Sequence, residues 1–140
     1  LLPHHLRALL AEPTLIPAGS SPEHGYAATD AALQAGCTVL MANSDPAAIG
    51  ILARLRELGT RVPEDVSVTG YGDILFSQYT CPALTTVNVH RMELGLIAWE
   101  MMRSLILDEP VVPQSPPPGE VMARQTTGPP PRPPAARPAP

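Results

Sequence analysis

The sequence predicts an α/β fold whose core is a parallel sheet built from βαβ units. Short apolar runs rich in β-branched residues alternate with segments that carry helix start and stop signals, a pattern typical of parallel α/β proteins. The chain has 140 residues, of which 44% are hydrophobic, so it is long enough for one buried core. We expect one α/β domain over residues 1–128 and a disordered, proline-rich tail over residues 129–140.

The first third of the chain is expected to hold a helix, a strand and a second helix. "LPHHLRALLA" (residues 2–11) resembles the later part of a helix, and "TLIPAG" (residues 14–19) resembles a short strand. In "SSPEHGYAATDAALQAG", Ser21 is the predicted N-cap, Pro22 the first helical residue and Gly36 the stop. The second helix is therefore well delimited at both ends.

A strand and a third helix follow directly. "CTVLMA" (residues 37–42) has the composition of a buried strand. In "NSDPAAIGILARLRELG", we expect Asp45 at the N-cap, Pro46 at the first helical position and Gly59 at the stop. Apolar residues spaced along this segment predict a broad buried face.

"RVPEDVSVTGYGD" (residues 61–73) predicts a turn, a buried strand and a tight second turn. Pro63 with its acidic neighbours favours a solvated turn, and residues 66–69 suit a strand. Gly70 and Gly72 allow the backbone to turn at the carboxyl end of that strand. Ligands bind at this edge of open parallel sheets, so the turn is a candidate site.

The remaining segments are a loop, an extended run and a long helix. "ILFSQYTCPA" (residues 74–83) is expected to be a loop, "LTTVNV" (84–89) extended, and residues 90–107 a helix that ends before Pro110. The helix leaves little polar surface, so it needs a partner surface to cover it. Alternation within "GEVMARQTTG" (119–128) permits one more strand.

Composition and motifs argue against several function classes. A formal net charge of −4 and a pI near 5.5 are unlike the basic surfaces that hold nucleic acid. No apolar run approaches the roughly 20 residues of a membrane span. Cys37 and Cys81 lack metal-site spacing and are expected to be free, buried thiols, and His4 and His5 lack a third ligand. We find no nucleophile motif or paired acid and base, and we predict no catalytic residue, metal or cofactor.

Several motifs in order give the chain a specific resemblance. "SDPAAIG", "VPEDVSVTGYGD", "YTCPALTTV", the "LG" at residues 94–95 and "MARQTTG" resemble the carboxyl-terminal half of LacI/GalR-family transcriptional repressors, from about residue 20 to residue 128. The resemblance implies a periplasmic-binding-protein type I fold, here truncated, with a small molecule bound between two α/β subdomains. It also implies a cytoplasmic regulator whose DNA-binding helix-turn-helix lies upstream of Leu1, and a first subdomain on which the helix 90–107 packs.

The resemblance also implies the positions of a ligand site. Family ligands are held by an aromatic residue at the position of Ser20, a polar residue at that of Ser44 and an aspartate at that of Gly72. Two of these three positions depart from the family pattern. Asp73 is displaced by one residue, so we expect its side chain to point elsewhere and to brace the loop. The implied effector is a sugar or a nucleoside-like molecule.

Dimer formation is the other property that the resemblance implies. Ile49 and Tyr79 occupy the family's interface positions, although Ile49 is equally well explained as core and Tyr79 as a surface aromatic. The leading hypothesis is an effector-binding and dimerisation module of a repressor, with DNA contacted only through the upstream headpiece. A periplasmic-type solute-binding protein and a degenerate remnant without effector binding remain as alternatives. Enzymatic activity has the least support.

Overall fold

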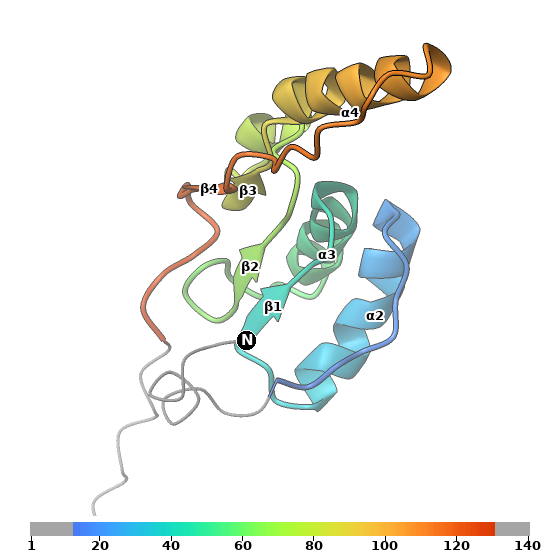
Figure 1. Ribbon diagram of the computed structural model, residues 1–140. Helices are drawn as coiled ribbons and strands as arrows, with labels where there is room; N and C mark the ends of the chain where they lie inside the picture. The colour runs from blue at the N-terminus through green and yellow to red at the C-terminus, as the bar shows by residue number, and fades with distance from the viewer. Residues whose placement is uncertain (1–12, 131–140) are drawn as a thin grey trace, which may run out of the picture.

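The computed structural model describes residues 13–130 and is shown in Figure 1. The predicted helix 2–11, with His4 and His5, lies outside the described residues, as does most of the predicted tail. The elements in chain order are α2 (Pro22–Gln34), β1 (Val39–Met41), α3 (Asp45–Glu57), β2 (Ser67–Thr69), the 3-10 helix η1 (Leu75–Tyr79), β3 (Thr86–Asn88), α4 (Arg91–Ile106) and β4 (Glu120–Met122).

The capping and stop residues of α2 and α3 are those that the sequence predicts, with one correction. Ser21 caps α2 by accepting a hydrogen bond from the backbone N–H of His24, and Gly36 adopts a φ of 75° just after the helix, as predicted. At α3 the N-cap is Ser44, because its hydroxyl accepts the N–H of Ala47. The prediction that Asp45 is the N-cap is wrong, since Asp45 is already the first helical residue.

The sheet confirms the predicted parallel βαβ arrangement. β1 pairs with β2 in parallel, with Leu40 opposite Val68, and α3 is the crossover between them. A parallel bridge between Thr69 and Thr85 continues the sheet towards β3. β3 pairs in turn with β4, which is antiparallel to it, so the additional strand predicted within residues 119–128 is present.

The predicted strand over residues 14–19 is not present. This segment passes beside β1 without joining a sheet in the described part of the chain. Pro17 has no backbone N–H to donate to a ladder, which explains why a strand does not form there. Ile16 nevertheless packs against the core, so the segment is held by side-chain burial rather than by strand pairing.

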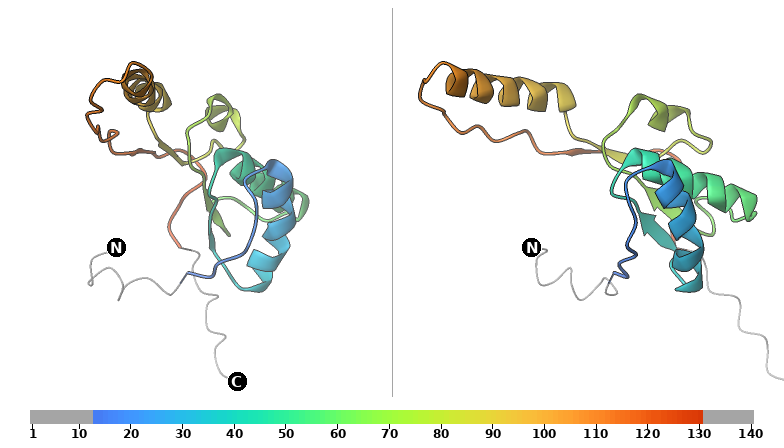
Figure 2. Two further views of the ribbon diagram at one scale, coloured as in Figure 1. Left: turned by 45° about the vertical axis from the view of Figure 1, so that its right-hand side comes forward. Right: turned by 90° about the vertical axis from the view of Figure 1, so that its right-hand side faces the viewer.

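The core lies between the β1–β2 pair and the two helices α2 and α3, which cover the same face of that pair (Figures 1 and 2). Leu40, Val68 and Leu55 are buried there, together with Leu84 from the segment before β3. The helices approach so closely that a Cβ at Gly50 would lie 1.8 Å from the carbonyl oxygen of Pro22. Glycine is therefore required where α3 crosses α2.

α4 has a different environment from α2 and α3. It projects away from the other helices at the far end of the molecule, on an arm formed with β3 and β4 (Figure 2). No residue of α4 is buried, and Trp99, Leu96 and Leu105 are each more than half exposed. The prediction that this helix carries an uncovered apolar surface is thus confirmed in the described chain.

Candidate functional site

Three segments meet at the carboxyl edge of the β1–β2 pair. Ser44 follows β1, and its hydroxyl donates a 2.7 Å hydrogen bond to the carbonyl oxygen of Ser20, from the segment before α2. The backbone N–H of Asp45 donates to the carbonyl oxygen of Tyr71, in the turn after β2, at 3.0 Å. The structure therefore brings Ser20 and Ser44 into contact and places the residue 70–73 turn next to them.

The backbone of the turn has a conformation that only some residues adopt easily. Gly72 has a φ of 126° and Asp73 a φ of 50°, so two consecutive residues have positive φ. The N–H of Gly72 bonds to the carbonyl oxygen of Val87 at 2.9 Å, which holds the turn against β3. An aspartate at position 72, as in the family pattern, would be strained in this conformation. Glycine therefore suits position 72 in the turn as it is folded here.

Asp73 braces the loop, as the sequence predicted. Its carboxylate accepts a 2.6 Å charged hydrogen bond from Arg124, and the two side chains are only 15% and 18% exposed. Arg124 also donates to the carbonyl oxygen of Leu84 at 2.8 Å, while Arg91 donates to the carbonyl oxygen of Asp73 at 2.9 Å. The carboxylate of Asp73 is thus already paired within the protein.

Asp45 is the most connected side chain at this edge. It is fully buried, and its carboxylate accepts hydrogen bonds from the backbone N–H of Ile74 at 2.8 Å and from the hydroxyl of Ser77 at 2.6 Å. The hydroxyl of Thr86 donates to the other carboxylate oxygen. Asp45 therefore links the start of α3 to the residue 70–74 turn, η1 and β3.

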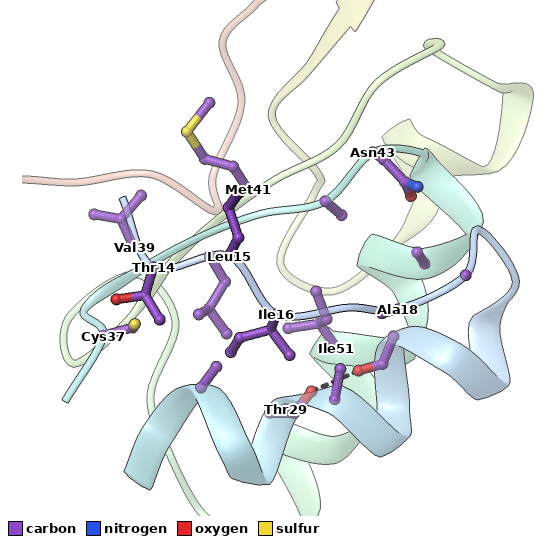
Figure 3. A pocket seen from close by; sticks show the side chains of 17 residues that line it. Thr14, Leu15, Ile16, Ala18, Thr29, Cys37, Val39, Met41, Asn43 and Ile51 are labelled. Atoms are coloured by element: carbon purple, nitrogen blue, oxygen red, sulfur yellow. Dashed lines mark hydrogen bonds between the residues drawn. The ribbon is translucent and has the colours of Figure 1, made fainter. Parts of the chain in front are cut away.

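Two hollows adjoin the edge. One, of about 480 Å³, is lined mainly by apolar and threonine side chains and includes Tyr71 and Asn43. The other, of about 290 Å³, lies between β1, α2 and the residue 14–19 segment, where Leu15, Ile16 and Ile51 line it (Figure 3). Asn43 lines both hollows, so its amide is the polar group that they share.

One shifted pKa lies close to this edge, since a hydrogen bond from Ser21 lowers the pKa of Glu23, and the others lie away from it. Hydrogen bonds from Arg61 lower the pKa of Asp65 to about 2, in the turn before β2. On the outer surface of α2 and α3, a hydrogen bond to Glu57 raises the pKa of Tyr26. Arg54, in α3, stacks on the ring of Tyr26 and forms an ion pair with Asp30, both in α2. These contacts hold α2 against α3.

The two predicted interface residues differ in exposure. Ile49 is partly buried within α3, whereas Tyr79 is 73% exposed at the end of η1. Leu75 and Phe76, also in η1, are 64% and 66% exposed, so this short helix exposes three large side chains with apolar surface. Sequence reasoning missed Leu75 and Phe76 because one short turn has too few residues to show a periodicity.

Other features have plainer outcomes. Cys37 is partly buried, but Cys81 is exposed, so the expectation that both thiols are buried is wrong for Cys81, which lies in the loop after η1. Residues 13–130 contain no group of three side chains suited to a metal ion. Over the same residues, the helices are all too short or too polar to span a bilayer.

Sequence reasoning also missed two other residues near the edge, Asn43 and Arg124. Asn43 directly precedes the "SD" pair, where the sequence pattern predicts only the start of a helix. Arg124 lies in "MARQTTG", where the alternating pattern predicts a strand but not the pairing of Arg124 with Asp73, 51 residues away. Only the folded chain reveals that pairing.

Comparison with known proteins identifies the family that this chain matches. Residues 5–127 match the family described as "Periplasmic binding protein-like domain". The HTH-type transcriptional repressor PurR of Escherichia coli O1:K1 / APEC is 36% identical over 96 residues, which are 67% of this chain and 28% of that protein. PurR of Vibrio vulnificus (strain CMCP6) is 38% identical over 72 residues, or 51% of this chain and 22% of that protein.

Solved structures give the same result. The transcription regulator CcpA of Lactococcus lactis superposes with a TM-score of 0.80 and 30% identity, over 88% of this chain and 46% of that chain. A LacI family transcriptional regulator from Enterococcus faecium, with bound ribose, has a TM-score of 0.75 and 31% identity, over 82% of this chain and 43% of that chain. The chain thus spans less than half the length of each of these proteins.

Proposed function

The chain belongs to the periplasmic binding protein-like domain family, and from this we propose that it is the effector-binding and dimerisation module of a LacI-type transcriptional regulator. One observation carries the proposal: Ser44 and the residue 70–73 turn lie together at the carboxyl edge of a parallel β-strand pair. The compared relatives are transcription regulators, which favours this function over solute transport and over enzymatic activity. A cytoplasmic location follows from the proposal.

We propose a hydroxyl-rich small molecule as the effector. Regulators of similar fold are described with bound ribose and with bound lactose. Asn43 and the exposed Tyr71 line one hollow. Ser44, next to Asn43, donates its hydrogen to Ser20 and can offer a ligand hydroxyl only an acceptor, so these groups suit sugar or nucleoside hydroxyls. The family's carboxylate is absent at Gly72, and Ser20 provides no ring for stacking. We therefore expect binding weaker than that of relatives with both groups.

The proposed function also implies which surfaces contact a second copy of the chain, DNA and the other subdomain. Tyr79, with the exposed Leu75 and Phe76 of η1, and Ile49 in α3 form the proposed homodimer contact. DNA is contacted through a helix-turn-helix elsewhere in the regulator, because this chain is acidic. The apolar surface of α4 packs on the other subdomain of the ligand-binding fold.

The upstream gene sequence is the first test of this assignment. We expect the DNA before the Leu1 codon to encode, in frame, a helix-turn-helix followed by further α/β sequence. A stop codon or a start codon close to Leu1 would contradict the assignment to a complete regulator.

Ligand binding is tested on the polypeptide encoded by the whole reading frame. Ribose, lactose and adenosine are titrated by calorimetry against the wild type, Ser44→Ala and Ser67→Ala. Ser67→Ala removes a hydroxyl at the other end of β2, which accepts the N–H of Gly128 at 3.2 Å, and serves as the structural control. We expect Ser44→Ala alone to weaken binding, by about tenfold for one lost hydrogen bond. Equal weakening by both variants would remove Ser44 from the site.

A further inference from the structure

The residue 70–74 turn is held by hydrogen bonds on two sides. Gly72 and Asp73 both have positive φ, and Tyr71 is exposed. A hydrogen bond from Gly72 to β3 and the ion pair of Asp73 with Arg124, which follows β4, hold one side of the turn. The other side faces the start of α3, where the only acidic side chain without exposure in the described chain is Asp45.

The contacts of Asp45 show what its carboxylate does. One oxygen accepts from the N–H of Ile74, the residue that ends the turn, and from the hydroxyl of Ser77 in η1. The second oxygen accepts from Thr86 in β3. No cation takes part in these bonds, and the carboxylate instead lies on the first turn of α3, where the helix dipole favours negative charge.

Gly70 supports this interpretation independently. A Cβ at Gly70 would lie 2.3 Å from the Oδ1 atom of Asp45 and 3.0 Å from the side chain of Leu84. Gly70 is buried, and its φ is not in the left-handed region, so a conformational reason for glycine is lacking. The requirement for glycine is the space that the carboxylate occupies. The strand end and the carboxylate are therefore packed directly together.

We propose that Asp45 is the positioning residue of the candidate effector site: its buried carboxylate sets the shape of the residue 70–74 turn through the N–H of Ile74, while Ser44 and Tyr71 contact the ligand. The functional meaning of this inference rests on the proposed effector-binding function. Its structural content, that the carboxylate of Asp45 holds the Ile74 end of the turn, stands separately. Thr86 lies in β3, the strand that leads to α4. Its hydrogen bond to the carboxylate of Asp45 therefore also connects the candidate site to the arm formed by β3, α4 and β4.

The chemistry of the three donors predicts how substitutions rank. Asp45→Ala leaves the N–H of Ile74 and two hydroxyls without an acceptor. Asp45→Asn keeps one oxygen, which can still accept from Ile74 and Ser77, and directs its NH₂ at the hydroxyl of Thr86, an atom that can also accept. The asparagine variant should therefore retain most of the shape of the turn, and the alanine variant should lose it.

The test measures amide hydrogen exchange by NMR in the 140-residue chain without ligand. In Asp45→Ala we expect the N–H of Ile74 to exchange faster by about tenfold, relative to the change at the buried N–H of Val68, with less than about threefold in Asp45→Asn. Leu55→Ala, which removes a buried side chain from the same helix, is the control. It should speed exchange at Val68 at least as much as at Ile74.

The outcomes separate the alternatives. Equal acceleration at Ile74 and Val68 in Asp45→Ala, or equal damage by alanine and asparagine, would show that Asp45 only stabilises the core, and would overturn the proposal. If Asp45→Ala does not fold, Ser77→Ala and Thr86→Val each remove one donor. Faster exchange at Ile74 in these variants supports the proposal, and unchanged exchange in both overturns it. A failed sugar titration would count against the proposed function but leave this result intact.

Discussion

The two halves of the described chain are held together in different ways. The α2–β1–α3–β2 half has a shared core, two helices packed at glycine contacts and a fully buried carboxylate. The β3–α4–β4 half has a 16-residue helix with no buried residue, joined to the rest by two short strands. Helices in proteins gain most of their stability from the packing of an apolar face, which α4 lacks in the part of the chain that the structure describes. The first half holds most of the buried core, to which the second contributes Leu84, whereas the helix α4 of the second half leaves most of its apolar side chains exposed in this chain.

Core truncation should give the largest difference between the halves. Leu55 is fully buried in α3, so Leu55→Ala should lower the free energy of unfolding by about 2–5 kcal/mol. Leu105 in α4 is 64% exposed, so Leu105→Ala should change it by no more than about 0.5 kcal/mol. Urea unfolding followed by circular dichroism measures both. Losses of equal size would mean that α4 is as well packed as α3.

Matched glycine substitutions sharpen the comparison. Gly50→Ala places a methyl group against the backbone of α2 and should cost about 1–3 kcal/mol. Gly95 in α4 has nothing within 4 Å of an added Cβ, so Gly95→Ala should stabilise that helix by about 0.5–1 kcal/mol. Thermal unfolding of the two variants should therefore shift in opposite directions. A loss of stability in both variants would mean that Gly95 packs against another part of the protein and would contradict this comparison.

Helix capping gives a smaller contrast. Ser44 caps α3 through its hydroxyl, so Ser44→Ala should cost about 1 kcal/mol of unfolding free energy. His90, at the N-cap of α4, has a φ of 49° and makes no side-chain cap bond. His90→Asn keeps a residue that tolerates this φ and should change stability by no more than about 0.5 kcal/mol. Denaturant midpoints of the two variants compare these effects, and a costly His90→Asn would contradict the account.

The smallest effect concerns pH and belongs to the first half. Arg61 lowers the pKa of Asp65 to about 2 from an ordinary value of 3.8, so the folded state favours the charged carboxylate. The resulting stabilisation is present above pH 3.8 and is lost as the pH falls through about 2. Arg61→Gln should remove this stabilisation at pH 7, where it is fully present, and have its smallest effect near and below pH 2, so the dependence of stability on pH in this window should flatten. An unchanged acid slope in that variant would rule out this pair as its source.

Much of the fold could be predicted because its signals are local. Ser21, Pro22 and Gly36 delimit α2, and the β-branched residues before Gly70 give β2, through rules that act over a few residues. The prediction failed where contacts between residues far apart in the sequence determine the structure, as at the N-cap of α3. Ser44 and Asp45 are both good caps, and the three donors that bury Asp45 come from positions 29 to 41 residues away.

The candidate site was only partly predictable for the same reason. Family motifs located Ser44 and the turn at Gly72, but the positive φ of Gly72 and Asp73 depends on how the turn meets β3. Residues 14–19 have strand composition, yet Pro17 removes a donor and no partner strand is present in the described chain. The exposure of α4, by contrast, was predictable from its nearly continuous apolar surface.

Hydrogen exchange followed by mass spectrometry tests the difference between the halves most directly. The measurement uses the 140-residue chain at a concentration where sedimentation shows a monomer. Amides of α3 should exchange at least about 100-fold more slowly than those of α4, because only the former open by disrupting a buried core. Comparable protection in the two helices would show that α4 is stable without a partner surface, and would contradict the account.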